Sequence, residues 1–269
     1  MTTARTAHPA PDPAGLRQSP WLRRFHQPEH PRPQAAPVLV VCPHAGGNAS
    51  FYFQLSRSLA AHAEVLTVQY PGRQERFGEP VPPTLAAFVE GLEQALAPWR
   101  EQGRPLVLFG HSMGALIAFE LARRLERAGE PARGLVLSGR RTPLIEREEN
   151  LHALGDEALI AHLSELAGTE PDLLGSPEMR ELILPALRGD YRAVETYRYE
   201  PGPVLGTPVS VLCGESDPRA GAAEVMGWRE LTDAAFTFRS FPGGHFYLVE
   251  QHEAVVRAVI EDLTVFTGA

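Results

Sequence analysis

The chain has 269 residues, of which 43% are hydrophobic and 22% charged, so it has the composition of a globular protein with one α/β domain or two small domains. Its formal net charge of −8 argues against a nucleic-acid partner, and no apolar run approaches the ~20 residues that span a bilayer. All 25 basic residues are arginine, which excludes chemistry that requires a catalytic lysine, such as Schiff-base formation.

The first 20 residues are rich in Ala, Pro and Thr and lack the apolar segment of a secretory signal. We therefore expect a disordered tail at 1–20, one folded domain at 21–269 and a cytoplasmic location. Cys42 and Cys213 lie in apolar runs, where a buried, inert thiol is expected rather than a disulfide. There is no Cys-x-x-Cys pair or Cys/His ligand cluster, so no metal site is expected.

Apolar runs alternate with amphipathic segments along the chain. A short edge strand is expected within 21–28, and buried strands are expected at 38–42, 65–68, 106–109, 135–138, 209–213 and 236–241. Helices are expected at 50–61, at 84–99 with Thr84 as N-cap, at 115–127 and at 251–266. This alternation predicts an α/β fold with a mostly parallel sheet of about seven strands, covered by helices on both faces.

One stretch, from about 143 to 199, contains no strand pattern. Helical patterns occur there at 156–167, 176–189 and 191–197. The stretch is inserted between two core strands, at the sheet edge where such folds bind ligands, so we expect a mobile lid over the site. Additional helical packing is the alternative.

The motif with the clearest chemical meaning is Gly110–His111–Ser112–Met113–Gly114, which lies between an apolar strand and a helix. In that context G-x-S-x-G is typical of the nucleophile elbow of α/β hydrolases, where small flanking residues allow a sharp turn that exposes the serine hydroxyl. We expect Ser112 to be a catalytic nucleophile. A glycine-rich turn without chemistry is the alternative.

A serine nucleophile needs a histidine base and an orienting carboxylate, which follow in this fold in the order Ser, Asp, His. Asp217 comes soon after the strand at 209–213, so we expect it to be the orienting carboxylate; Glu215 and Asp190 are competing acids, and a turn residue before Pro218 is the alternative for Asp217. His245 lies on a glycine-rich loop after the last strand, so we expect it to be the base. An ordinary loop histidine is the alternative for His245.

The turn after the strand at 38–42 has the sequence Pro-His-Ala-Gly-Gly and is suited to an oxyanion hole. We expect its donors to be the backbone N–H groups of Ala45 and of Met113, the residue after the nucleophile. His44 and His111 flank the site and are expected to pack around it rather than to react. An ester, a thioester or an amide would all suit this set of residues.

Six motifs together resemble one family, the type II thioesterases of modular polyketide and nonribosomal peptide synthesis. They are PHAGG at 43–47, YPGRQER at 70–76, GHSMG at 110–114, LRGDY at 187–191, GESDP at 214–218 and GGHFY at 243–247. The resemblance implies a discrete enzyme that removes aberrant or stalled acyl groups from the phosphopantetheine arm of acyl or peptidyl carrier proteins. It implies transient carrier partners, a lid, and no metal or diffusible cofactor.

Arg73 and Arg76 lie within the YPGRQER motif. We expect a structural salt bridge from them to the body of the fold; contact with phosphopantetheine or an acidic carrier surface is the alternative hypothesis. Three further functions remain open at this point: a medium-chain thioesterase of fatty acid synthesis, a carboxylesterase, lipase or aminopeptidase on the same fold, and a synthase-docking protein without turnover.

Overall fold

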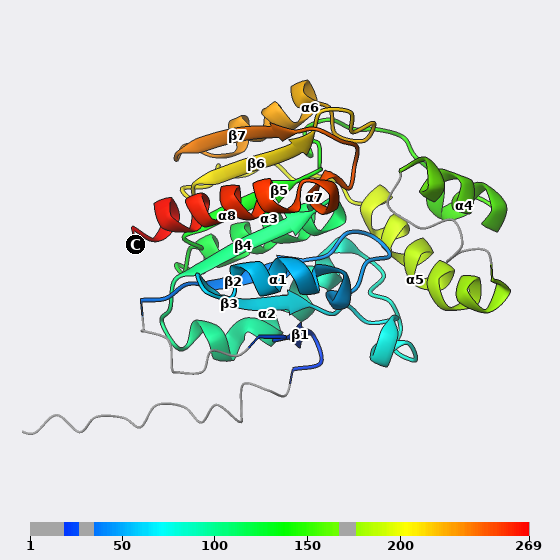
Figure 1. Ribbon diagram of the computed structural model, residues 1–269, viewed down its shortest axis with the longest axis horizontal. Helices are drawn as coiled ribbons and strands as arrows, with labels where there is room; N and C mark the ends of the chain where they lie inside the picture. Colours follow the sequence, from blue (N-terminus) through cyan, green and yellow to red (C-terminus); the bar gives the residue numbers. More distant parts are fainter. Residues whose placement is uncertain (1–18, 27–34, 167–175, 269) are drawn as a thin grey trace, which may run out of the picture.

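The centre of the molecule is a single twisted sheet. The computed structural model describes residues 19–26, 35–166 and 176–268, and among these seven strands form a sheet in the order β1-β3-β2-β4-β5-β6-β7 (Figure 1). All neighbouring strands are parallel except the edge pair β1 and β3. The strands are β1 (Leu22–Arg23), β2 (Val38–Cys42), β3 (Glu64–Val68), β4 (Leu106–His111), β5 (Gly134–Ser138), β6 (Val209–Gly214) and β7 (Phe236–Phe241).

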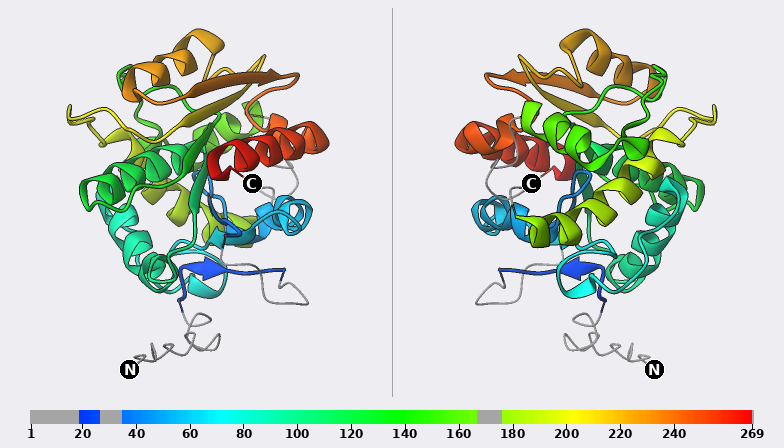
Figure 2. Two further views of the ribbon diagram at one scale, coloured as in Figure 1. Left: turned by 90° about the vertical axis from the view of Figure 1, so that its left-hand side faces the viewer. Right: turned by 90° about the vertical axis from the view of Figure 1, so that its right-hand side faces the viewer.

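Alternate side chains of the buried strands pack on opposite faces of the sheet. Leu39 and Val41 face α1 (Phe53–Leu59) and α8 (His252–Thr267), which cover one side. Val40 and Cys42 face the other side, together with α2 (Leu85–Arg100) and α3 (Met113–Arg127). Figure 2 shows the two helix layers on either side of the sheet. Because side chains alternate between the two faces of each strand, the sheet contributes to two separate hydrophobic cores, one on each side.

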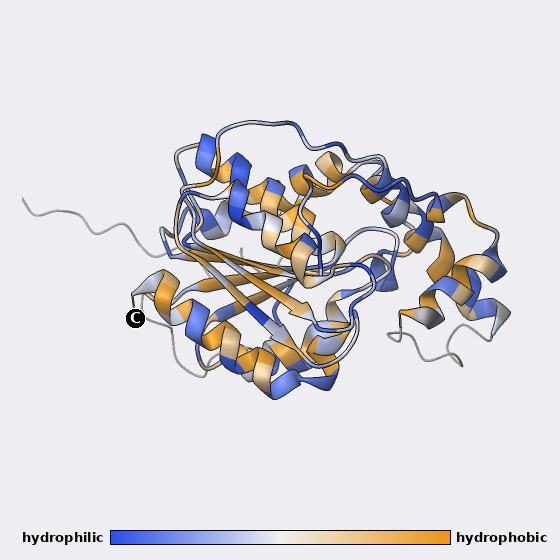
Figure 3. Cartoon of the chain, turned by 90° about the horizontal axis from the view of Figure 1, so that it is seen from above, coloured by the Kyte–Doolittle hydropathy of each residue, from blue (hydrophilic) through white to orange (hydrophobic). Residues whose placement is uncertain are grey.

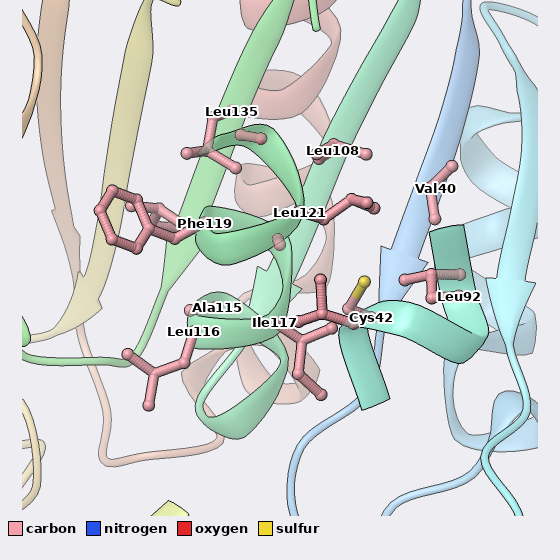
Figure 4. Close-up of a cluster of buried hydrophobic side chains, with 14 of the residues drawn as sticks. Val40, Cys42, Leu92, Leu108, Ala115, Leu116, Ile117, Phe119, Leu121 and Leu135 are labelled. Carbon is pink, nitrogen blue, oxygen red and sulfur yellow. The ribbon is translucent and has the colours of Figure 1, made fainter. Parts of the chain in front are cut away.

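The core beneath α3 is the larger of the two. Figure 4 shows Leu116, Ile117 and Leu121 of this helix packed among strand residues such as Leu108 and Leu135. These side chains are at most 2% exposed, as is most of the apolar strand surface. Because α3 starts at the residue after Ser112, this packing fixes the position of the predicted nucleophile.

The strands and helices expected outside the insertion all occur, with small changes at their ends. The side chain of Thr84 accepts a hydrogen bond from the N–H of Ala87, as an N-cap should. The segment predicted as one helix at 50–61 is a 3-10 turn (Ala49–Tyr52) followed by α1, and a further short helix, α7 (Tyr247–Glu250), precedes α8. Residues 1–18 of the expected N-terminal tail lie outside the described residues.

The insertion contains two helices, α4 (Asp156–Glu165) and α5 (Pro177–Glu195). The prediction of separate helices at 176–189 and 191–197 was wrong, because α5 continues through Gly189. A glycine inside a helix costs about 1 kcal/mol relative to alanine, but Leu187 and Tyr191 on either side of it are buried against Leu159 of α4. The helices lie beyond the carboxyl ends of the central strands (Figure 1), and Figure 3 shows that both apolar and polar residues occur along them.

Both cysteines are unpaired and buried, in β2 and β6. Burial raises the pKa of Cys213 to about 11, and that of Cys42 further, so both thiols stay protonated at neutral pH. Among the described residues there is no helix long and apolar enough to cross a membrane.

Candidate active site

Ser112 occupies a strained turn between β4 and α3. Its backbone has φ 55° and ψ −115°, and Gln74 is the only other described non-glycine residue with positive φ. The turn is held by the N–H of Ser112, which donates to the carbonyl of Ser138 at 2.8 Å. Such strain persists only where the surrounding structure enforces it, and here two glycines and the packing of α3 do so.

The two glycines of the motif are required by close backbone approaches. A Cβ atom on Gly110 would lie 2.0 Å from the carbonyl oxygen of Gly114, and one on Gly114 would lie 2.0 Å from the carbonyl oxygen of Cys42. Neither position therefore accepts a side chain without displacing the backbone. The turn has the geometry of a nucleophile elbow.

The structure brings Asp217 and His245 together at the ends of β6 and β7. The Nδ1 atom of His245 lies 2.9 Å from Oδ2 of Asp217, and the other oxygen, Oδ1, accepts the backbone N–H of Arg219 at 2.8 Å. Both side chains are almost completely buried. The competing acids lie elsewhere: Glu215 is exposed, and Asp190 is paired with Arg73.

Ser112 and His245 line one cavity, together with Ala45 and Met113. Its volume is about 30 Å³, which is space for roughly two water molecules. Leu163, Leu166, Tyr191 and Val194 of the insertion form its outer wall. A cavity of this volume is too small for an acyl chain, and residues of the insertion contribute to its lining.

The loop that carries Ala45 is held in place by the ion pair between Arg73 and Asp190. The guanidinium of Arg73 binds both carboxylate oxygens of Asp190 at 2.8 Å and donates to the carbonyl of Gly47 at 3.0 Å. Asp190 also accepts the N–H of Gly46 at 2.8 Å, and it is 0% exposed. No acceptor for the N–H of Ala45 or Met113 is found among the described residues, so both remain available to a ligand.

Both arginines of the YPGRQER motif have structural roles. Arg73 pairs with α5 of the insertion rather than with the body of the fold, where a partner was expected. Arg76 pairs with Glu79, donates to the carbonyl of Gln69 at 2.8 Å and lies over the ring of Trp21. Each arginine is 5% exposed, and neither lines the cavity, so the geometry gives no support to a carrier contact.

His44 and His111 lie beside His245 and remain neutral. Burial, followed by the charges of His245 and Arg73, lowers the pKa of His44 to about 3, and burial likewise lowers the pKa of His111. The Nδ1 atom of His44 is 2.9 Å from the hydroxyl of Tyr52. Since burial raises the pKa of Tyr52, this hydroxyl keeps its proton at neutral pH, and it also accepts the backbone N–H of His44 at 3.4 Å.

A second Ser–His pair lies under the elbow. Ser138 Oγ is 2.9 Å from Nδ1 of His111 and 2.6 Å from the hydroxyl of Tyr247. Ser138 and His111 are fully buried and do not line the cavity, so no substrate carbonyl can reach them. Their hydrogen bonds fix the ends of β4 and β5 beneath Ser112.

Two features of this region were not found from the sequence. The Arg73–Asp190 pair joins two motifs that are far apart in the chain. Arg140 lines the cavity, and its buried Nε atom has no hydrogen-bond partner among the described residues. The sequence did hold a signal for the role of Arg140, because Arg140 and Arg141 are two neighbouring arginines just after the strand predicted at 135–138. Among the described residues no group of His, Cys, Asp and Glu side chains could hold a metal ion.

The sheet order, the elbow and the paired Asp217 and His245 define an α/β hydrolase. Comparison with known proteins defines the family. Residues 37–263 match the thioesterase domain family. The chain is 44% identical to thioesterase PikA5 of Streptomyces venezuelae over 250 residues, covering 93% of this chain and 87% of that protein.

Two solved structures are similar to this one. The type II thioesterase BorB, from the borrelidin biosynthetic cluster, is 44% identical with a TM-score of 0.79, over 90% of this chain and 97% of that one. YbtT, a type II thioesterase from the yersiniabactin NRPS/PKS pathway, is 31% identical with a TM-score of 0.78, over 88% and 96%. The chain belongs to the thioesterase family, among the type II thioesterases of polyketide and nonribosomal peptide clusters, and is a hydrolase of thioester bonds.

Proposed function

We propose that Ser112 is the nucleophile, His245 its general base and Asp217 the carboxylate that orients the base. The N–H groups of Ala45 and Met113 form the oxyanion hole. The observation that carries this proposal is the Asp217–His245 hydrogen bond beside a cavity that is also lined by the strained Ser112.

The mechanism follows from this geometry. When the Nδ1–H group of His245 donates a hydrogen bond to Asp217, Nε2 is left as the acceptor for the hydroxyl proton of Ser112. The alkoxide attacks the thioester carbonyl, and the two N–H groups stabilise the oxyanion. Protonated His245 then gives its proton to the departing thiol, and in the second half it activates the water that hydrolyses the acyl-serine.

The substrate in this proposal is an aberrant or stalled acyl group on the phosphopantetheine arm of an acyl or peptidyl carrier domain, which meets the enzyme transiently in the cytoplasm. Support comes from the names of the relatives, which place BorB in the borrelidin cluster and YbtT in an NRPS/PKS pathway. No cofactor takes part, because the triad supplies the nucleophile and both proton transfers.

We further infer that residues 143–199 form a lid on a domain that spans 21–269. The closed cavity of about 30 Å³ supports this, because an acyl-pantetheine enters only if α4 and α5 move away from Ser112. The lid packs through a small core of its own, made of Leu159, Leu184, Leu187 and Tyr191.

A carrier protein loaded with acetyl, propionyl or a longer acyl group tests the proposal. Loss of each group is followed by intact-protein mass spectrometry with the wild-type chain and with Ser112→Ala. We expect hydrolysis by the wild type and a rate at least roughly 1,000-fold lower for Ser112→Ala. Faster loss of acetyl and propionyl would indicate editing, and faster loss of long groups would indicate chain release or a fatty-acid role.

Two results would contradict the proposal. Activity on simple oxygen esters without activity on the carrier would favour a carboxylesterase. Full restoration of product titre in cells by Ser112→Ala would favour a docking protein without turnover.

A further inference from the structure

The corner at the end of β5 holds an arginine in a fixed position next to the cavity. The carbonyl of Arg140 accepts the indole N–H of Trp228 at 2.7 Å, and Trp228 is 1% exposed. The preceding residue, Gly139, donates its N–H to the carbonyl of Leu212 in β6 at 2.9 Å. The backbone that carries the guanidinium is therefore rigid, as a binding site requires.

Three arginines at this corner share one carboxylate. Glu149 binds Arg219 at 2.6 Å and Arg141 at 3.5 Å, and its charge also acts on Arg140. The Nε atom of Arg140 and the Nη1 atom of Arg141 are buried and have no hydrogen-bond partner among the described residues. Since Glu149 is shared by its two partners, Arg140 is left without an ion pair there.

None of the other acids nearby is hydrogen-bonded to Arg140. The carboxylate of Glu195, which lines both spaces, accepts the N–H groups of Leu151 and His152 and lies against the His152 ring. Glu146 and Glu148 are exposed at the rim. Burial, followed by repulsion from Arg141 and Arg219, lowers the pKa of Arg140 to about 9, which still leaves it charged at neutral pH.

Arg140 also connects two spaces. It lines the cavity that contains Ser112, and it lines an adjoining cleft of about 90 Å³ between the 140–149 segment and the end of α5. Glu149, Val194 and Glu195 line both spaces as well. Because Arg140 lines both spaces, a charged group on a substrate bound at Ser112 can reach its side chain from either space.

We propose that Arg140, with the buried edge of Arg141, forms an anion subsite beside Ser112 that binds a carboxylate or phosphate oxygen of the thioester substrate. A guanidinium without a partner in a partly dry site is costly, and a bidentate oxygen ligand removes that cost. The subsite rests on the proposed function, because the anion belongs to the thioester that Ser112 attacks.

The anion has two sources, which differ in reach. The carboxylate of a malonyl-type acyl group is separated from the thioester carbonyl by one methylene carbon. The phosphate of the phosphopantetheine arm lies at its far end, roughly 15 Å away when the arm is extended. The first would bind Arg140 inside the Ser112 cavity, and the second would bind it through the adjoining cleft.

Three small thioesters distinguish these sources: S-acetyl-pantetheine, S-malonyl-pantetheine and S-acetyl-phosphopantetheine. The readout is the KM of each charged substrate divided by that of S-acetyl-pantetheine, for the wild-type chain, Arg140→Met and Arg140→Lys. We expect Arg140→Met to raise one of the two ratios about ten-fold or more, the change that follows loss of one hydrogen bond to a charged group. Arg140→Lys should recover part of it.

Arg198→Met is the matched control. Arg198 lines the same cleft, but it is exposed and already donates to the carbonyls of Glu195 and Tyr197. Its KM ratios should equal those of the wild type. A rise for the malonyl substrate alone identifies the acyl carboxylate as the anion, and a rise for the phosphorylated substrate alone identifies the arm.

The subsite is overturned if both KM ratios of Arg140→Met equal those of the wild type. It is also overturned if the KM ratios of Arg198→Met rise as much as those of Arg140→Met. If Arg140→Met does not fold, the wild-type chain still decides: it should bind at least one anionic thioester more tightly than the neutral one, and this preference should fade in high salt. Failure of the proposed function is distinct, because the wild-type chain would then leave S-acetyl-pantetheine intact.

Discussion

Two arginines near the cavity, the buried Arg73 and the half-buried Arg140, have opposite surroundings. Arg73, under the oxyanion loop, has a bidentate carboxylate and two backbone carbonyls as acceptors. Arg140, on the β5 side, has no hydrogen-bond acceptor among the described residues. A buried charge with every donor satisfied indicates a structural role, whereas one without a partner indicates a place for a ligand.

The largest effect should come from breaking the pair under the oxyanion loop. Asp190→Ala leaves the guanidinium of Arg73 buried without its carboxylate, so we expect the free energy of unfolding to fall by about 3–5 kcal/mol. Urea unfolding measures it. The double variant Arg73→Met/Asp190→Leu, which removes both charges, should recover much of the loss; a double variant as unstable as the single one would show that the pair is not the cause.

A milder change at the same position separates positioning from stability. Asp190→Asn keeps an oxygen acceptor for the N–H of Gly46 but weakens the hold on Arg73 and Gly47. If this hold positions Ala45 as an oxyanion donor, kcat per folded enzyme should fall about ten-fold with little change in KM. Unchanged kcat in a correctly folded Asp190→Asn enzyme would restrict Asp190 to a structural role.

Burial, with smaller contributions from the charges of His245 and Arg73, lowers the pKa of His44, so the stability of the fold should depend on pH. The folded pKa of His44 is lowered to about 3, whereas an unfolded histidine has a pKa near 6.5. Between these values the unfolded chain binds the extra proton, so stability is complete above about pH 6.5 and falls with decreasing pH by up to about 1.4 kcal/mol per pH unit.

His44→Gln should remove this contribution and flatten the pH dependence of the free energy of unfolding between pH 6 and 4.5. His62→Gln is the matched control, because His62 is exposed. The idea fails if the slopes of His44→Gln and the wild type coincide, or if both variants flatten the slope equally.

The smallest effect should come from Arg140→Met, and it should have the opposite sign to that of Asp190→Ala. Removal of a half-buried charge that has no ion pair leaves no other group unsatisfied, so we expect the free energy of unfolding to be unchanged or to rise by about 1 kcal/mol. Thermal unfolding measures it. A loss as large as that of Asp190→Ala would mean that Arg140 supports the fold, and the contrast between the two arginines would disappear.

Much of the fold could be predicted from local patterns. Continuous apolar runs predicted the buried strands correctly, because each of these strands is covered on both faces. Thr84 marked the start of α2, because its side-chain oxygen satisfies an otherwise unpaired backbone N–H. The pattern failed at α5, where Gly189 suggested a break. Packing against α4, which does not depend on local preference, keeps that helix continuous.

The positions of Ser112, Asp217 and His245 after predicted strands were enough to bring them to one edge of the sheet, because the carboxyl ends of parallel strands meet there. The tertiary structure was needed to show that Asp217, rather than Glu215 or Asp190, bonds to His245, since all three side chains carry a carboxylate. It also decided which arginine has a partner, because a salt bridge across 117 residues depends on the packing of α5 and not on any local pattern.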